Sequence, residues 1–332
     1  VELTPSARDR MAAGRAAADA VAARRHVYAR TTGVGANYEV LVEAEGREHA
    51  LRLLRSHASG MGEPLAAEVV RTTAIVRLSQ MAAPGGAHRP EVADALVALL
   101  RSGELPELGD LGGIGTGDIS VLAQLALALV ESDDGFELAE GDAAPFIGSN
   151  AATLAVAALA WADLRELLDA GLAVAAETFR ALDGNREAFA APVGAARPLP
   201  GLVAVADTMR VLTEDAGPPA RLQDPFGLRC LPQVAGALHG ALGALHDVLA
   251  VDIAAAAENP LVSDGEVLHH GGFHAAPVAL ALDTARLAVV PFVQLSVARL
   301  AHLMEPRLTG LTPFLAAAAA LLLAAAPAVH AA

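Results

Sequence analysis

Cysteine and aromatic residues are scarce in this chain, and both shortages restrict what it can be. Cys230 is the only cysteine among 332 residues, which excludes disulfides within the chain and cysteine-based zinc sites and favours a reducing, cytoplasmic location. Aromatic residues are 3% of the chain, whereas hydrophobic residues are 54%. The cores must therefore be filled with Ala, Leu and Val, a composition typical of closely packed helices.

Basic residues are also few, because 23 Lys and Arg face 38 Asp and Glu, for a net charge of -15. A nucleic-acid-binding surface needs clustered Lys and Arg, so we expect no nucleic-acid partner. No basic, apolar leader opens the chain, so secretion is not indicated. Residues 313–329 lack charge and are nearly all Ala and Leu. Because Ala is weakly hydrophobic, we expect a buried helix or a docked tail there and no membrane partner.

The pattern of apolar residues predicts helices and little strand. Leu238, Leu242, Leu245 and Leu249 recur at helical spacing and form one stripe of a helix over residues 237–251. Residues 151–182 are apolar almost all round, with Trp161 as the single large aromatic. This predicts a central helix that is buried on every face. Gly240 and Gly243, inside the helical pattern, predict a close approach of two helices.

The remaining pattern predicts an all-α protein. Further helices are expected at residues 8–25, 48–57, 65–82, 90–101, 119–130 and 275–303, and residues 38–42 give a weak strand signal. Length allows one or two domains. We expect a region over 1–150 that carries Tyr28 and the segment 112–119, and a central helical bundle over 151–332 with the remaining motifs. Irregular loops on such a rigid frame are where chemistry tends to lie.

The sequence around two residues, Tyr28 and Arg229, suggests a chemical role for each of them. Tyr28 precedes a turn of Thr31-Thr32-Gly33-Val34-Gly35, and it can act as a base if donors or positive charge favour loss of its proton. The alternative is a packing residue with a satisfied hydroxyl. Arg229 stands beside Cys230 in an apolar turn and suits a carboxylate ligand. Its alternative is a structural ion pair with Asp224 or a helix carboxylate.

Two glycine-rich loops carry residues that could suggest metal or phosphate binding. His269, His270 and His274 form a cluster with no carboxylate at a ligand spacing, so we expect solvated loop histidines and no metal. The run at 112–117 lacks the Lys-Ser/Thr that completes a phosphate loop. Its glycines instead permit a tight, unusual backbone.

Several segments, in order along the chain, resemble the aromatic amino acid lyase superfamily, which includes histidine and phenylalanine ammonia-lyases. Residues 222–234 are similar to the family signature Gln-Asp-Pro-Tyr-Ser-Leu-Arg-Cys, and residues 258–261 resemble its Asp-Asn-Pro-Leu. Residues 271–277 resemble Gly-Asn-Phe-His-Gly-Gln-Pro. Weaker matches are residues 28–35, the Ser-His of the histidine enzymes at 56–57, and residues 310–315.

The resemblance implies a mostly helical, elongated bundle of the ammonia-lyase type, similar to fumarase and aspartase, that assembles as a homotetramer with active sites shared between subunits. Family members eliminate or shift the amino group of an aromatic amino acid with a methylidene-imidazolone group formed from Ala-Ser-Gly. On that pattern Tyr28 is the base, Arg229 holds the carboxylate and Asn259 completes the site. The implied substrate pocket contains Ser56, His57, Asn150, Gln223, Phe226 and Phe273.

Departures from the family pattern concentrate around the prosthetic group. The triplet reads Gly115-Thr116-Gly117, and Thr116 could dehydrate only to a bulkier, methyl-capped alkene. The supporting Ile-Asn-Gly reads Ile147-Gly148-Ser149, with Asn150 displaced downstream, and the second active-site tyrosine is Phe226. The family's Asn and Gln around its Phe-His motif are here Gly272 and Ala276.

These departures favour a lyase-like enzyme that works without the prosthetic group and needs no cofactor. It would act on a small molecule by elimination or cyclisation in a biosynthetic pathway, with Tyr28 as base and Arg229 on a carboxylate or carbonyl. One alternative is an orthodox ammonia-lyase or aminomutase of the histidine type, in which the triplet cyclises. The other is a non-catalytic paralogue that binds a small molecule.

Overall fold

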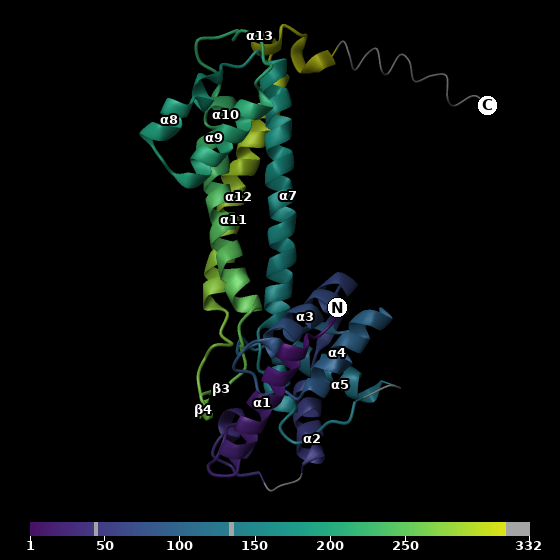
Figure 1. Cartoon of the computed structure of the whole chain (residues 1–332). Helices are drawn as coiled ribbons and strands as arrows, with labels where there is room; N and C mark the ends of the chain where they lie inside the picture. The colour runs from purple at the N-terminus through teal and green to yellow at the C-terminus, as the bar shows by residue number, and fades with distance from the viewer. Residues whose placement is uncertain (43–45, 133–135, 317–332) are drawn as a thin grey trace, which may run out of the picture. The chain divides into compact units, whose positions relative to one another are not determined.

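A computed structural model of the chain describes residues 1–42, 46–132 and 136–316, which are mostly helical (Figure 1). Contacts divide the chain into two compact units, each discontinuous in sequence. The first unit holds residues 1–160 and 246–279, and the second holds residues 161–245 and those from 280 onward. The predicted all-α class is confirmed. The division expected at residue 150 lies close to the first crossing between the units and stays a prediction.

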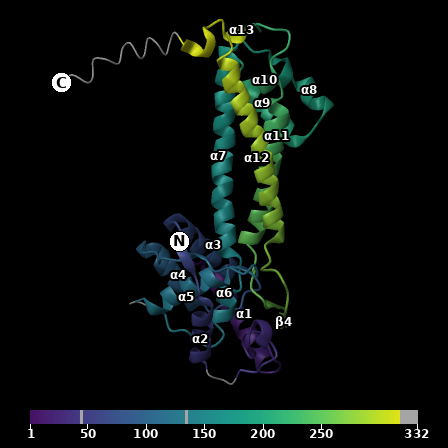
Figure 2. The same cartoon turned by 180° about the vertical axis from the view of Figure 1, so that it is seen from behind.

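Short helices and two small hairpins build the first unit. Its helices include α1 (Pro5–Ala22), α2 (Arg47–His57), α3 (Ala67–Ala82), α4 (Pro90–Ser102), α5 (Ile119–Glu131), α6 (Ala143–Ile147) and the 3-10 turn η1 (Gly35–Asn37). The strands pair antiparallel, β1 (Met61–Pro64) with β2 (Gly109–Leu111) and β3 (Leu261–Ser263) with β4 (Glu266–Leu268). Seen from behind, α6 lies beside α2 and α5 (Figure 2).

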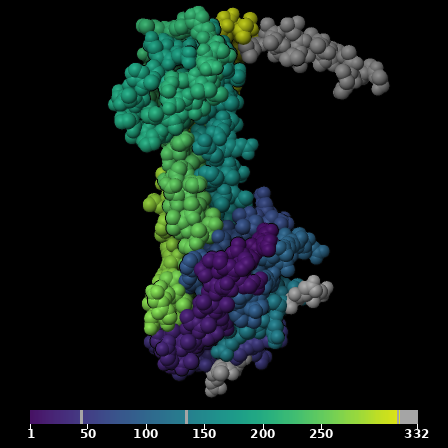
Figure 3. Space-filling model, in the orientation of Figure 1, coloured from purple at the N-terminus to yellow at the C-terminus, as the bar shows by residue number. Residues whose placement is uncertain are grey.

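Local chemistry explains where these helices begin and end. Thr4 precedes α1 and its hydroxyl accepts from the N–H of Ala7 at 3.3 Å, while Pro5 occupies the first turn, where its missing N–H costs nothing. Helix α4 ends at Gly103, whose φ of 78° is left-handed and suits glycine. One stripe of α1 is buried and the rest lies on the surface of the first unit (Figure 3).

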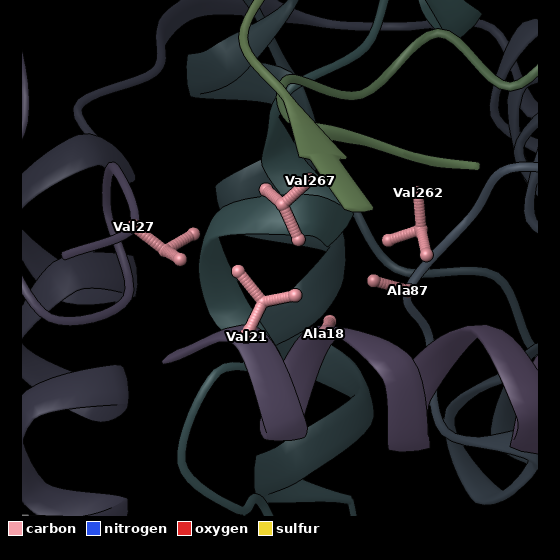
Figure 4. Close-up of a cluster of buried hydrophobic side chains, with 6 residues drawn as sticks. All are labelled: Ala18, Val21, Val27, Ala87, Val262 and Val267. Carbon is pink, nitrogen blue, oxygen red and sulfur yellow. The ribbon is translucent and has the colours of Figure 1, made fainter. Parts of the chain in front are cut away.

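A cluster of buried aliphatic side chains joins three parts of the first unit (Figure 4). Its members are Ala18 and Val21 of α1, Val27 of the segment after α1, Ala87, and Val262 and Val267 of the β3–β4 hairpin. Val27 is 1% exposed, and burial of such a side chain contributes about 1.5–3 kcal/mol. The cluster therefore fixes the residue before Tyr28 against the hairpin that follows Asn259.

The second unit packs around long helices. It contains parts of α7 (Ala151–Ala181), α11 (Leu231–Ile253) and α12 (Ala276–Leu303), which run through both units, with η2 (Arg186–Phe189), α8 (Ala191–Ala196), α9 (Pro200–Leu212), α10 (Phe226–Arg229), α13 (Pro306–Thr309) and η3 (Pro313–Leu315). Phe179 and Phe189 pack with ring centroids 5.4 Å apart. Helices α9 and α11 approach closely, since a Cβ on Gly201 would lie 2.1 Å from the carbonyl oxygen of Gly236.

The sequence predictions for α7 and for residues 38–42 are wrong, whereas the prediction for Gly240 holds in part. Helix α7 is not buried on every face, because Val156, Leu167 and Val174 are 49%, 45% and 62% exposed and the chain itself covers only part of the helix. The close helix approach predicted for Gly240 and Gly243 occurs beside Gly240, whose backbone nitrogen lies 3.2 Å from where a Cβ on Gly201 would stand. Gly240 and Gly243 themselves have open space where a Cβ would stand. Residues 38–42 form no strand and contribute only a bridge between Thr32 and Leu41.

Within the described residues, three helical stretches are long and apolar enough to cross a membrane by length and composition alone: Ala143–Ala181, Phe226–Ile253 and Ala276–Leu303. Only 22% of the most apolar window of the last one is buried within the chain, so its surface has room for a packing partner. The apolar run at 313–329 lies mostly outside the described residues. The expectation of no membrane partner stays a prediction.

We predict that Gly201→Ala destabilises the protein by about 1–3 kcal/mol, because the added methyl group meets backbone that cannot move aside cheaply. Gly194→Ala is the matched control. Its Cβ would make an ordinary 3.6 Å contact with Val203, so we expect a change within about 0.5 kcal/mol. Urea unfolding followed by circular dichroism measures both. Equal stabilities of the two variants would contradict the close approach of α9 and α11.

Candidate active site

The first unit contains a cavity of about 530 Å³ that gathers most of the predicted site residues. Predicted residues that line it are Tyr28, Ser56, His57, Thr116, Gly117, Asn259 and Phe273. They come from five separate segments, so the fold brings together side chains that the sequence keeps far apart. The cavity also has walls outside the motifs that the sequence analysis assigned to the site, namely Ser59, Ser120 and Ala144.

Tyr28 lies on a turn in which the residues before and after it are both fixed by hydrogen bonds. The hydroxyl of Thr31 accepts from the N–H of Val27 at 2.9 Å, and the hydroxyl of Thr32 accepts from the N–H of Ala29 at 3.3 Å. Ala29 has a φ of 59°, which is strained for a residue with a Cβ. Strain of this kind persists only where the surroundings impose it, so the orientation of Tyr28 is fixed by its neighbours.

A backbone donor meets the Tyr28 hydroxyl. The N–H of Gly35, at the start of η1, donates to Tyr28 Oη at 3.1 Å. A hydrogen bond to a phenol oxygen strengthens as negative charge develops there. The arrangement is compatible with a tyrosine that gives up its proton, and the glycine that makes the contact is the last residue of the Thr-Thr-Gly-Val-Gly turn.

His57 presents an acceptor to the cavity. Its Nδ1 lies 2.9 Å from the carbonyl oxygen of Leu53, and a carbonyl only accepts, so Nδ1 carries the proton and Nε2 is the free acceptor. The hydroxyl of Ser56 donates to the same carbonyl at 2.9 Å. The end of α2 therefore offers a ligand a nitrogen that binds an N–H or O–H group.

Asn259 is oriented by the loop that follows β4. Its Oδ1 accepts from the N–H of His270 at 2.8 Å, which identifies the oxygen of the amide, because a backbone N–H needs an acceptor. Among the residues that the structure describes, no acceptor takes the Nδ2 group of Asn259. The side chain therefore has two N–H donors to offer a ligand oxygen.

The loop of residues 112–119 forms another wall of the cavity. Gly115 and Gly117 have φ values of 85° and 100° that favour glycine. Asp118 then pins the loop, because its N–H donates to the Ser149 carbonyl at 2.8 Å and its carboxylate accepts from both the N–H and the hydroxyl of Thr153 at 2.7 Å. Burial raises the pKa of Asp118 despite these donors, which lower it. The carboxylate caps the first turn of α7.

The residues around the triplet differ from those that support the prosthetic group in the family pattern. Gly148 lines the cavity without a side chain to donate a hydrogen bond. Asn150, expected in the pocket, does not line it. Its side chain is buried and its Oδ1 accepts from Gln80 at 3.0 Å. Phe226 has no hydroxyl and belongs to the second unit. The amide and hydroxyl donors of the family pattern are therefore not supplied by these residues.

A buried charge cluster lies behind this wall. Arg77, His88 and Glu258 are each at most 1% exposed. Arg77 donates to the carbonyls of Pro145 and Phe146 at 2.7 and 3.0 Å, and His88 Nε2 lies 2.7 Å from the Glu258 carboxylate. Burial alone would raise the pKa of Glu258, but the charges of His88 and Arg77 outweigh it and lower that pKa to about 2. Glu258 is therefore an anion directly before Asn259.

Arg229 does not line the cavity of Tyr28. It lines a cavity of about 440 Å³ in the second unit together with Gln223 and Cys230. Gln223, with its amide oxygen facing Arg229, accepts from the guanidinium at 3.2 and 3.3 Å, and the Phe226 ring centroid is 5.7 Å from Arg229 Cζ.

The ion pair of Arg229 with Asp224, considered as an alternative, does not form. Asp224 is buried and pairs with Arg221 at 3.0 Å. None of the carboxylates within the described ranges is an ion-pair partner of Arg229, whose side chain is exposed. The guanidinium is therefore available to an anionic ligand.

The sequence suggested that the histidines of the 269–274 loop are solvated. In the structure, two of them make hydrogen bonds within the protein. His269 accepts from the backbone N–H of Tyr28 at 3.2 Å, and the ring of His270 contacts the Glu258 carbonyl at 3.0 Å. No group of metal-binding side chains occurs in the part of the chain that the structure describes. Sequence reasoning missed these contacts because it tested the histidines only as ligands of a metal. Their position directly after Asn259 and its hairpin was the available signal.

The fold and the cavity define a helical-bundle protein with a tyrosine, an amide and a histidine around one cavity. The family model for aromatic amino acid lyases matches residues 1–136 and 132–330. Histidine ammonia-lyase of Geobacillus kaustophilus is 34% identical over 326 residues, covering 89% of this chain and 64% of the relative. Histidine ammonia-lyase of Symbiobacterium thermophilum is 36% identical, covering 95% and 68%.

Solved structures agree on the fold. Tyrosine aminomutase from Streptomyces globisporus superposes with a TM-score of 0.87 at 24% identity, over 95% of this chain and 69% of that one. Histidine ammonia-lyase from Trypanosoma cruzi gives 0.83 at 24% identity, over 94% and 65%. The chain belongs to the aromatic amino acid lyase family, a family of carbon–nitrogen lyases. It spans about two thirds of the length of the curated relatives that it matches.

We predict that Glu258→Gln destabilises the protein at neutral pH by about 3–5 kcal/mol, since it leaves the buried charge of Arg77 unpaired. Because folding lowers the pKa of Glu258 from its ordinary 4.5 to about 2, this carboxylate contributes stability that is present above pH 4.5 and is lost as the pH falls toward 2. The gap in unfolding free energy between the two proteins should therefore narrow below pH 4.5. Urea unfolding across that range measures it. Glu91→Gln, at an exposed carboxylate, should show no such narrowing, and a gap independent of pH would contradict the assignment.

Proposed function

We propose that this chain is a lyase that acts on a small carboxylate or carbonyl substrate without a methylidene-imidazolone group. Tyr28 is the base, Asn259 donates to a substrate oxygen, and Arg229 holds the carboxylate. The observation that carries the proposal is one cavity that gathers Tyr28, His57 and Asn259, while Gly148 has no side chain and Asn150 does not line this cavity. The base and the binding groups are kept where the support of the electrophile is changed.

The chemistry follows from what these residues can do. Tyr28 Oη, as a phenolate met by the Gly35 N–H, takes a proton from a substrate carbon. The electron pair left on that carbon forms a double bond or closes a ring, and the leaving group departs with its own bonding pair. General base catalysis contributes about 10² to 10⁴ in rate. The substrate must therefore have a more acidic C–H bond or a better leaving group than an unactivated amino acid.

Arg229 requires a second copy of the chain in this proposal. Tyr28 and Arg229 line different cavities of one chain, and we propose a homotetramer in which Arg229 of one subunit serves the Tyr28 cavity of another. The apolar surface of α12 supports assembly, because Leu280, Leu287 and Val297 are 71%, 71% and 62% exposed. Surfaces of this kind are typical of interfaces between subunits.

The acceptor at His57 Nε2 supports a substrate whose side chain donates an N–H or O–H. An imidazole side chain has such a donor, and the curated relatives named above are histidine ammonia-lyases. We therefore propose a polar aromatic or heteroaromatic substrate, handled in the cytoplasm.

An orthodox ammonia-lyase or aminomutase is the second candidate. Identity of about a third to histidine ammonia-lyases favours it, and so do the left-handed Gly115 and Gly117, which permit the tight turn that cyclisation needs. The two candidates differ in the covalent state of Thr116.

We predict that the intact mass of the purified protein equals the mass of its sequence, with no water lost from the triplet. Cyclisation and dehydration would remove two waters together and add absorbance of the conjugated product. Mass spectrometry under denaturing conditions measures the covalent state, and native conditions give the number of subunits. Loss of both waters would replace our first candidate with the second, and Thr116→Ala, which has no hydroxyl to lose as water, is the control.

We predict that Tyr28→Phe slows proton exchange at the substrate carbon by about 10² to 10⁴. The test is uptake of solvent deuterium by histidine, phenylalanine, tyrosine and their hydroxy-acid analogues, measured by NMR. Tyr38→Phe is the matched control, since Tyr38 is 56% exposed and outside the 530 Å³ cavity. Exchange that survives in Tyr28→Phe at the wild-type rate would remove the base assignment. No exchange with any of these compounds in the wild-type protein would restrict the substrate to one with the more acidic C–H bond or better leaving group described above.

A further inference from the structure

Tyr28 separates two cavities. A second one, of about 480 Å³, is lined by His26, Thr32, Tyr38 and His269 and shares Tyr28, Gly35 and Asn259 with the first. Groups in the second cavity can therefore act on Tyr28 from the side away from Ser56 and His57.

His269 is bonded to the backbone of Tyr28. The Tyr28 N–H donates to Nε2 of His269 at 3.2 Å, so this nitrogen must be without a proton. A neutral imidazole with its proton on Nδ1 satisfies the contact. A protonated imidazole carries a hydrogen on Nε2 that would point at the Tyr28 N–H, and the bond would be lost.

Hydrogen bonds of His270 fix the backbone next to His269. Its Nδ1 accepts from the N–H of Gly272 at 2.8 Å, so its proton is on Nε2, which donates to the Glu258 carbonyl at 3.0 Å. Its own N–H donates to Asn259 Oδ1. Two consecutive histidines thus contact the two proposed catalytic residues of this cavity: the ring of His269 accepts from the backbone of Tyr28, and the backbone of His270 donates to the side chain of Asn259.

Packing holds this loop against the Tyr28 turn. Val267 of β4 and Val262 of β3 share the buried aliphatic cluster with Val27 (Figure 4). The β3–β4 hairpin that leads from Asn259 to His269 therefore contacts the residue before Tyr28. Rigid support of this kind keeps the contact between His269 and Tyr28 at a defined length.

We propose that His269 is a positioning residue for Tyr28, which it holds in the cavity through a hydrogen bond that exists only while its imidazole is neutral. The functional meaning of this bond rests on the proposed role of Tyr28 as base. The bond itself is a geometric feature that can be measured without a substrate.

The charges around His269 favour the neutral form. Burial lowers the pKa of His269 below its ordinary 6.5, and the positive charge of Arg25 and the neighbouring His270 lower it further. His26 and Tyr38 share its cavity. The lowered pKa means that the bond is present at neutral pH and is lost only as the pH falls below about 6.5.

The test uses the two tyrosines of the chain. In Tyr38→Phe protein grown with fluorotyrosine, Tyr28 gives the only fluorine NMR signal, which we expect to move with a midpoint below pH 6.5. With His269→Gln the signal should stay at its neutral-pH position, because Gln accepts the same bond but does not titrate. With His269→Ala it should take the acid position at every pH. His26→Gln, in the same cavity, should leave the titration unchanged.

The outcomes separate the two proposals. A titration that persists in His269→Gln, that disappears in His26→Gln, or that is absent from the parent protein would overturn the role of His269. A titration that depends on His269, combined with unchanged deuterium exchange in Tyr28→Phe, would keep the positioning contact and remove only the role of Tyr28 as base.

Discussion

The buried guanidinium of Arg77 is the constraint from which the rest of the cavity follows. A charge without access to water is tolerated only when other groups surround it with hydrogen bonds and opposite charge. Arg77 meets this need with the carbonyls that end α6 on one side and with Glu258 on the other. Because Asn259 follows Glu258, and Gly148 follows α6, a single charge on α3 sets the distance between two walls of the cavity. Removing it would release both walls at once.

Local patterns predicted the helices, and the residues that the resemblance assigned to the site, among them Tyr28, His57 and Asn259, line one cavity. The sequence predictions failed for polar side chains that could form hydrogen bonds with more than one partner. Asn150 was expected in the pocket, but Gln80, seventy residues away, binds its oxygen in the core. His269 and His270 looked solvated because their partners, Tyr28 and Glu258, are distant or on the backbone. Such choices depend on tertiary contacts that neither spacing nor composition contains.

The wrong prediction for α7 has a different cause. An apolar face predicts burial, but it does not say whether the same chain or another copy covers it. Val174 and Leu287 remain exposed in the chain by itself, as they would be if the covering surface came from a neighbour. Arg229 fits the same explanation, since it is an exposed cation without a carboxylate partner among the described residues, in a cavity that lacks the base.

The anchoring of the 112–119 loop bears on what the altered triplet does. Asp118 ties the loop to Ser149 and to the start of α7, at the cost of a half-buried carboxylate whose pKa is raised by burial. That cost is hard to explain if the loop were merely a remnant, because a solvated loop needs no carboxylate that is partly removed from water. If Thr116 stays uncyclised, the anchor serves the shape of the cavity: it holds Gly117 against Ser149 and leaves Thr116 at the wall as a hydroxyl. The site then has hydrogen-bond donors and acceptors but no electrophile, and the driving force for elimination must come from the substrate and from Tyr28.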